Sequence, residues 1–153
     1  LIQKFGKKNM DEIVLISGGF DPIHSGHIKL IQDASNYGNV VVLLNSDEWL
    51  KNKKGIEFLP FEERKIIMMA LKNVVDVIIC GSIDDTCIDG IKVAVKKYHN
   101  CKIKFANGGD RNDKSTPESV FCEKNNIELL WGIGGENKSN SSSWILKKWK
   151  DNS

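Results

Sequence analysis

Hydrophobic residues along this chain fall into two kinds of segment that alternate. The first kind is short, continuous and rich in β-branched residues, which is typical of strands covered on both faces by helices. These runs occupy residues 12–16, 40–45, 74–80, 102–106 and 127–131. The second kind has apolar residues three or four positions apart, which predicts helices over residues 28–37, 60–74, 88–98, 117–125 and 141–150.

The spacing also predicts which helix faces are buried. In the helix that begins after Pro60, the expected buried side carries Ile66, Met69, Ala70 and Asn73, with Ile67 and Leu71 beside them. In residues 88–98 it carries Ile88, Ile91, Val95 and Tyr98. Glu62 and Glu63 fall in the first turn after Pro60, where carboxylates interact favourably with the helix dipole.

Strands that alternate with helices predict βαβ units. The expected fold is α/β, with a doubly wound, mostly parallel five-stranded sheet in one domain over residues 12–150. Residues 1–11 are interpreted as an extension or an expression remnant, because the chain opens on Leu1 and has Met10 inside this segment. Ligands of such sheets bind beyond the carboxyl ends of the strands, so the loops after the strands are the expected site.

Composition narrows the class of protein further. The chain has 153 residues, 41% hydrophobic and 27% charged, with a net charge of +2, which is ordinary for a globular domain and predicts neither a nucleic-acid partner nor a membrane partner. No apolar run has the length of a membrane span, and no signal-peptide core is visible. The four cysteines, Cys80, Cys87, Cys101 and Cys122, lack C-x-x-C spacing and are expected to be reduced and structural. We therefore expect a cytoplasmic protein.

The candidate chemistry lies in "ISGGFDPIHSGHIKL", residues 16–30. Gly18 and Gly19 allow a sharp turn and a close approach of backbone amides to a ligand. The helix start that follows supplies free N–H groups and a positive dipole end, which together favour an anion. His24 and His27 are three residues apart, so both rings are expected near one side of that helix start and within reach of one phosphate. One alternative is that one histidine is a surface residue of the helix cap and the other a hydrogen-bonded core residue. A second alternative is a metal site with Asp21 as the third ligand.

The same stretch resembles the signature G-x-F-D-x-x-H-x-G-H of the cytidylyltransferase-like nucleotidyltransferases. The matching positions are Gly19, Phe20, Asp21, His24, Gly26 and His27. The resemblance implies a Rossmann-like nucleotidyltransferase fold. It also implies that His24 and His27 contact the nucleotide phosphates and stabilise the transition state.

Four further segments resemble the family in the same order along the chain. "NSDEWLKNKKG" is similar to the N-S-D-x-x-x-K-x-x-K-G segment of the heptose-phosphate adenylyltransferase branch, and it implies that Lys51 or Lys54 reaches a phosphate. The residues alone suggest a solvated basic loop there. Pro60 and Arg64 match a P-x-x-x-R helix, with a phosphate contact for Arg64. Gly108, Gly109 and Asp110 match a G-G-D loop, and Ser141, Ser142 and Ser143 replace an S-T-T element; both would contact the nucleotide.

One departure from the family separates its branches. Many cytidylyltransferases have an arginine five residues before the serine, where this chain has Glu136, with Lys138 nearby as a partial substitute. The resemblance therefore favours transfer of an adenylyl group from ATP to a sugar phosphate such as heptose 1-phosphate, with Mg²⁺ on the triphosphate. The alternatives are transfer from CTP to glycerol 3-phosphate or an amino-alcohol phosphate, a non-catalytic nucleotide sensor, and a metal-dependent hydrolase. Family members often dimerise, so a homodimer is expected.

Overall fold

The computed structural model contains a five-stranded sheet in which every neighbouring pair of strands is parallel. The structure describes residues 11–108, 114–135 and 141–153. The strands are β1 (Glu12–Gly18), β2 (Asn39–Asn45), β3 (Val74–Cys80), β4 (Lys102–Gly108) and β5 (Glu128–Ile133), in the spatial order β3-β2-β1-β4-β5. The predicted doubly wound parallel sheet is confirmed.

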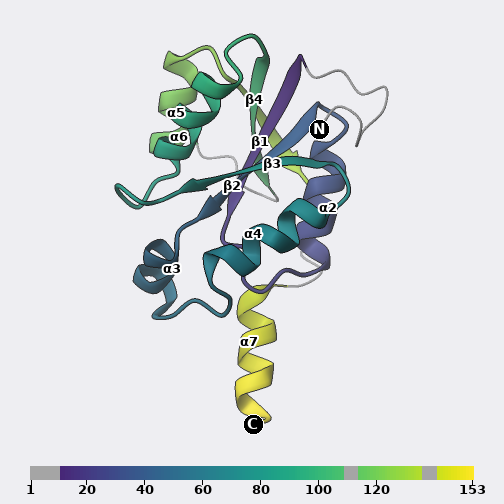
Figure 1. Ribbon diagram of the computed structural model, residues 1–153, viewed down its shortest axis with the longest axis vertical. Coiled ribbons are helices and arrows are strands. Elements are labelled where there is room, and N and C mark those ends of the chain that lie inside the picture. Colours follow the sequence, from purple (N-terminus) through teal and green to yellow (C-terminus); the bar gives the residue numbers. More distant parts are fainter. Residues whose placement is uncertain (1–10, 109–113, 136–140) are drawn as a thin grey trace.

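Six helices accompany the strands (Figure 1). They are α2 (Ser25–Ala34), α3 (Asp47–Lys54), α4 (Phe61–Ala70), α5 (Ile88–Lys97), α6 (Pro117–Lys124) and α7 (Ser142–Asp151). One core lies between the sheet and helices α2 and α4, and a second core lies between the opposite face and helices α5 and α6. Consecutive residues of β1 alternate between the two, with Leu15 in one core and Ile16 in the other. This explains why the strands read as unbroken apolar runs.

The chain reverses its direction of travel across the sheet after β3. The first three strands run from β1 outward to β3, and the crossover through α5 then returns the chain to β4, on the other side of β1. The loops after β1 and β4 consequently diverge, and this divergence is the usual position of a ligand crevice in open α/β sheets. Both the histidine loop and Gly108 lie at this carboxyl edge.

Three local predictions were wrong. Residues 47–54 form helix α3 rather than a basic loop, because Ser46 caps it by accepting a hydrogen bond from the Trp49 amide at 3.1 Å. In α4 the buried residues are Arg64 and Met68, whereas Ile66 is 64% exposed. In α5, Ala94 is buried in place of Val95.

The expectation of buried, structural cysteines is met by three of the four, whereas Cys101 is only half-buried. All four are free thiols, and Cys80, Cys87 and Cys122 are buried. Burial raises the pKa of Cys80 and of Cys122 to about 12, so both thiols stay protonated near neutral pH. Within residues 11–108, 114–135 and 141–153, no helix is long and apolar enough to cross a membrane.

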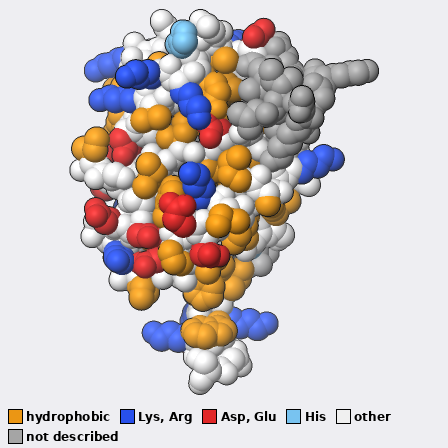
Figure 2. Space-filling view, viewed as in Figure 1, with side chains coloured by type: hydrophobic (Ala, Val, Ile, Leu, Met, Phe, Trp, Pro, Cys, Tyr) orange, Lys and Arg blue, Asp and Glu red, His pale blue; other side chains and the backbone are white. Residues whose placement is uncertain are grey.

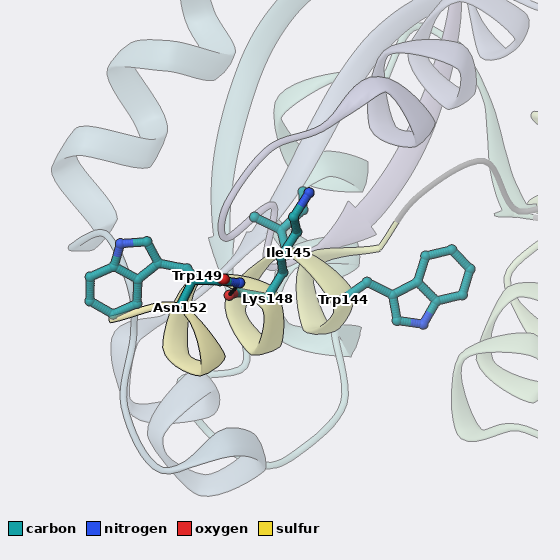
Figure 3. Close-up of a pocket in the computed structure, with 5 residues that line it drawn as sticks. All are labelled: Trp144, Ile145, Lys148, Trp149 and Asn152. Atoms are coloured by element: carbon teal, nitrogen blue, oxygen red, sulfur yellow. Dashed lines mark hydrogen bonds between the residues drawn. The ribbon is translucent and has the colours of Figure 1, made fainter.

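Helix α7 projects away from the rest of the chain (Figure 1). None of its ten described residues is buried, and Trp144 and Trp149 are 54% and 65% exposed. Figure 2 shows hydrophobic surface flanked by lysine side chains at this end of the molecule. A hollow along the helix is lined by four α7 residues and by Asn152, which caps the helix at its C-terminus, and the two tryptophans point away from each other (Figure 3). This surface is therefore separate from the crevice at the carboxyl ends of the strands.

Candidate phosphate-binding site

The loop after β1 is held close to its neighbours by its glycines. A Cβ atom on Gly19 would lie 2.7 Å from Cδ2 of Leu50 in α3, and one on Gly18 would lie 3.2 Å from the ring of Phe20. Phe20 itself is 4% exposed and belongs to the core on the α2 side, and its ring centroid lies 4.7 Å from that of His27. The Phe20 side chain therefore anchors the loop in the core, and only the backbone of Phe20 is left to contact a ligand.

His24 and His27 cap helix α2 reciprocally. The Gly26 amide donates to Nδ1 of His24 at 3.0 Å, and the His24 amide donates to Nδ1 of His27 at 3.2 Å. The two rings stack with centroids 3.8 Å apart. A nitrogen that accepts a hydrogen bond carries no proton, so both neutral imidazoles bear their proton on Nε2. The capping geometry thus gives two Nε2–H donors at the N-terminus of one helix.

This arrangement is compatible with both roles predicted for the histidine pair, which are capping of the helix and hydrogen bonding to a phosphate. The capping alternative agrees with the structure at Nδ1 of both rings, and the same two bonds assign the N–H group of each neutral ring to Nε2. The metal alternative fits less well, because the Asp21 carboxylate accepts hydrogen bonds from two backbone amides on another loop. Among the described residues, no group of three or more His, Cys, Asp or Glu side chains is placed to hold a metal ion.

Burial and, to a smaller extent, the neighbouring His24 together lower the pKa of His27 to about 4. An unfolded histidine has a pKa of about 6.5, so between pH 6.5 and 4 the unfolded chain binds the extra proton and the folded chain does not. The contribution of His27 to stability is therefore constant above about pH 6.5 and decreases as the pH falls toward 4.

We predict that acidification from about pH 7.5 to pH 5 costs the wild-type protein about 1 to 2 kcal/mol more stability than it costs the His27→Asn variant. Urea unfolding of both proteins at the two pH values measures the difference. Asparagine does not titrate, so all other acid-sensitive groups cancel in the comparison. Equal losses for the two proteins would contradict a depressed pKa for His27.

Asp21 connects the histidine loop to the segment between α3 and α4. Its side chain is 2% exposed, and its two carboxylate oxygens accept from the amides of Phe58 at 2.6 Å and Leu59 at 2.7 Å. Lys54 donates to the Asp21 carbonyl oxygen at 2.6 Å, and its Nζ lies 3.1 Å from the carboxylate. The Asp21 carboxylate therefore fixes the histidine loop to the neighbouring segment, and its side chain is not available to contact a ligand.

The two candidate lysines differ in position. Lys54 is 29% exposed at its side chain and is tied to the histidine loop through Asp21. Lys51 is 55% exposed and lies 3.9 Å from Glu57, in a surface ion pair that contributes little to stability. The structure thus brings Lys54, and not Lys51, into contact with the loop that bears the histidines.

Arg64 is placed differently from the sequence prediction. Its side chain is fully buried and donates four hydrogen bonds, at 2.7 to 3.0 Å, to protein oxygens. The acceptors are the carbonyl oxygens of Leu59, Gly19 and Asn45 and a carboxylate oxygen of Asp47. The expected direct phosphate contact does not agree with this geometry, because the guanidinium group is already committed to these acceptors. The intrahelical alternative with Glu62 or Glu63 is not what forms either.

The N-terminus of α7 meets the histidine loop. The Ser142 hydroxyl donates to the Pro22 carbonyl oxygen at 2.8 Å, and Ser141 caps the helix by accepting from the Trp144 amide at 3.0 Å. Ser143 is exposed in the same first turn. The positive ends of α2 and α7 therefore converge on one place, a stronger attraction for an anion than either helix provides alone.

The remaining predicted residues lie on the β4 side of the crevice. Gly108 ends β4, and a Cβ atom there would lie 3.4 Å from Cδ1 of Leu30 in α2, so this strand end packs directly on the helix that carries His27. Gly109 and Asp110 lie outside the described residues. The sequence matches the family at Asp47, in the "NSD" triplet, but it gave this residue no role, because its partner Arg64 is 17 positions away in the chain.

The geometry defines an α/β protein with a candidate anion site at the switch point of a parallel sheet, where two helix N-termini and two imidazoles meet. A family model described as Cytidylyltransferase-like matches residues 15–136, and the chain belongs to this family.

Curated relatives include two proteins named Bifunctional protein HldE. The one from Aliarcobacter butzleri (strain RM4018) is 30% identical over 155 residues, covering 99% of this chain and 29% of the relative. The one from Geobacter metallireducens is 33% identical over 156 residues, covering 94% of this chain and 28% of the relative. The chain therefore spans less than a third of the length of these relatives.

Two solved structures share the fold. A lipopolysaccharide core biosynthesis protein from Thermoplasma volcanium GSS1 aligns with a TM-score of 0.60 at 21% identity, covering 78% of this chain and 93% of the other. A putative nicotinate-nucleotide adenylyltransferase from Vibrio parahaemolyticus aligns with a TM-score of 0.55 at 16% identity, covering 94% and 89%. At these identities the likeness concerns the fold alone.

Proposed function

We propose that the protein is a nucleotidyltransferase that joins a nucleoside monophosphate from an NTP to a phosphorylated acceptor. The observation that carries the proposal is the convergence of the α2 and α7 N-termini at Pro22, beside the stacked rings of His24 and His27. This place offers N–H donors and positive dipole ends. Such a site suits a reaction in which two anions must be aligned.

The proposed reaction needs no general base. The acceptor phosphate has a second pKa of about 6 and is already ionised near neutral pH. One of its oxygens forms a bond to the α-phosphorus of the NTP, the bond from that phosphorus to the bridging oxygen breaks, and pyrophosphate leaves with the electron pair. The protein contributes alignment of the reactants and stabilisation of negative charge.

Each group in the crevice has a proposed role in this reaction. Nε2–H of His24 and of His27 donates to oxygens on the reacting phosphates, and the low pKa of His27 keeps it a neutral donor throughout. The backbone of the loop after β1 and of the first turn of α7 holds the rest of the triphosphate. Lys54 supplies positive charge beside the histidine loop, while Lys51 is left with a peripheral role. Gly109 and Asp110 remain predicted nucleotide contacts.

Magnesium is expected to arrive with the NTP. The described groups at the crevice are mostly N–H donors, and the Asp21 and Asp47 carboxylates are engaged with backbone amides, Lys54 or Arg64. These residues do not form a Mg²⁺ ligand set, so phosphate oxygens and water would hold the ion.

The proposed substrates are ATP and a sugar phosphate such as heptose 1-phosphate, following the resemblance of residues 45–55 and 108–110 to the heptose-phosphate branch. CTP with glycerol 3-phosphate or an amino-alcohol phosphate is the alternative pair. We also propose a homodimer in solution, supported by the exposed apolar surface of Trp144 and Trp149.

A pyrophosphate-release assay tests the proposal. ATP and CTP are each offered with Mg²⁺ and a panel of acceptors containing heptose 1-phosphate, other sugar 1-phosphates, glycerol 3-phosphate and phosphocholine. We expect release that depends on an acceptor and is fastest with ATP and a sugar phosphate. Tight binding of a nucleotide with no release for any acceptor would instead identify a sensor and would refute catalysis.

A further inference from the structure

Arg64 connects three loops at the carboxyl edge of the sheet. Its Nη1 donates to the carbonyl oxygens of Gly19, in the loop after β1, at 3.0 Å and of Asn45, at the end of β2, at 2.8 Å. Its Nε donates to the carbonyl oxygen of Leu59, in the loop before α4, at 2.8 Å. The loop after β1 carries His24, and the segment before α4 contacts that loop through Asp21. A buried guanidinium that donates to all three segments fixes their relative positions.

Asp47 completes the arrangement from the first turn of α3. Its Oδ1 accepts from Nη2 of Arg64 at 2.7 Å, and its side chain is 34% exposed. A fully buried cation without a counter-ion destabilises the fold, so the Asp47 carboxylate compensates the charge of Arg64 and also fixes the direction of its planar group. The ring of Phe61 lies 5.6 Å from the guanidinium carbon and covers another side of it.

The bond to Gly19 bears directly on the phosphate site. In a trans peptide the N–H points opposite to the C=O, so holding the Gly19 carbonyl toward Arg64 turns the Phe20 amide away from Arg64. Phe20 has a φ of +50°, a conformation that non-glycine residues rarely adopt and that surrounding contacts must maintain. The Phe20 amide belongs to the same short loop as His24, and its direction is set by the Arg64 bond.

We propose that Arg64 and Asp47 act as a positioning pair that orients the Gly19–Phe20 peptide for phosphate binding, and that Arg64 does not itself contact phosphate. The inference rests on the proposed function for its catalytic consequence. Its structural part, control of the loop after β1 by a carboxylate on α3, stands on the hydrogen bonds alone.

The Asp47→Asn variant separates positioning from direct contact, because the two roles predict opposite signs. If Arg64 binds phosphate, removing the Asp47 charge frees the guanidinium, removes a repelling anion and tightens ATP binding. If Arg64 positions the loop, the same change loosens the guanidinium. We then expect amide hydrogen exchange in residues 18–27 at least about tenfold faster, turnover about tenfold lower, and ATP binding unchanged or weaker.

Glu48→Gln is the matched control. Glu48 is an exposed carboxylate in the same first turn of α3, so its replacement changes the net charge and the helix-dipole interaction equally without touching Arg64. Isothermal titration calorimetry with ATP and Mg²⁺, hydrogen exchange measured by mass spectrometry, and turnover with the best acceptor are compared for the full chain. The control is expected to match the wild type in all three.

Arg64→Lys provides the second variant, because lysine keeps the charge but cannot span four acceptors. It is expected to reproduce the faster exchange of Asp47→Asn, and the double variant is expected to show no further increase, since both changes break one unit. Tighter ATP binding by Asp47→Asn, or unchanged exchange in residues 18–27, would overturn the proposal. Absence of transferase activity in the wild type would refute the proposed function, while the exchange comparison would still decide the positioning role.

Discussion

Replacing His27 by asparagine is expected to lower turnover by at least about 100-fold while the protein stays folded. The side-chain oxygen of asparagine can occupy the position of Nδ1 and accept the His24 amide, so the reciprocal cap of α2 is preserved. What asparagine lacks is the Nε2–H donor. The loss therefore isolates the stabilisation of negative charge from the support of the helix.

His27→Gln is the matched variant, because its amide nitrogen reaches toward the position of Nε2 but its side chain no longer caps the helix as Nδ1 does. We expect glutamine to retain more turnover than asparagine and to unfold more easily. Steady-state kinetics and urea unfolding of the three proteins measure both quantities. Turnover of His27→Asn within about threefold of the wild type would remove His27 from the chemistry.

Replacing Asp21 by alanine is expected to reduce the free energy of unfolding by about 3 kcal/mol. The change leaves the amides of Phe58 and Leu59 without their acceptor and takes the counter-ion from Lys54. The Lys54 ammonium is partly exposed and can be hydrated, so the expected cost is at the lower end for a broken buried ion pair. Urea unfolding measures the difference.

Two further variants define the origin of this loss. Asp21→Asn keeps the shape and one acceptor oxygen but places an N–H group against a backbone donor, so we expect a loss of about 2 kcal/mol. Asp85→Ala removes an exposed carboxylate and keeps the carbonyl oxygen that accepts from Trp49, so a change within about 0.5 kcal/mol is expected. A loss below about 1 kcal/mol for Asp21→Ala would mean that the loop does not depend on this carboxylate.

The parallel sheet was predictable because its strands are covered on both faces and therefore read as unbroken apolar runs. Helix α3 was not, because its eight residues include six charged or amide side chains and only the capping Ser46 marks its start. The buried face of α4 was misjudged for a related reason. Periodicity treats Arg64 as a solvent-exposed residue. Its burial depends on carbonyl oxygens that no pattern in the chain displays, and two of them, those of Gly19 and Asn45, are 45 and 19 positions away.

The candidate site shows the same division. The H-x-x-H spacing and the following helix start placed His24 and His27 correctly on one side of α2. The assignment of their protons to Nε2 required the two amide bonds, and the meeting of Ser142 with Pro22 joins residues 120 positions apart. Short-range geometry was accessible from the sequence, whereas contacts between loops were not.

Helix α7 gives the protein a built-in optical reporter. The protein has four tryptophans. Trp144 and Trp149 are exposed and both lie on α7, while Trp49 and Trp131 are partly buried. Iodide quenches an indole by contact from the solvent, so the part of the intrinsic fluorescence that iodide quenches arises mainly from Trp144 and Trp149. This helix begins at Ser142, which contacts the histidine loop. A change in iodide quenching on addition of a nucleotide would therefore report, without any label, that α7 responds to binding at this loop.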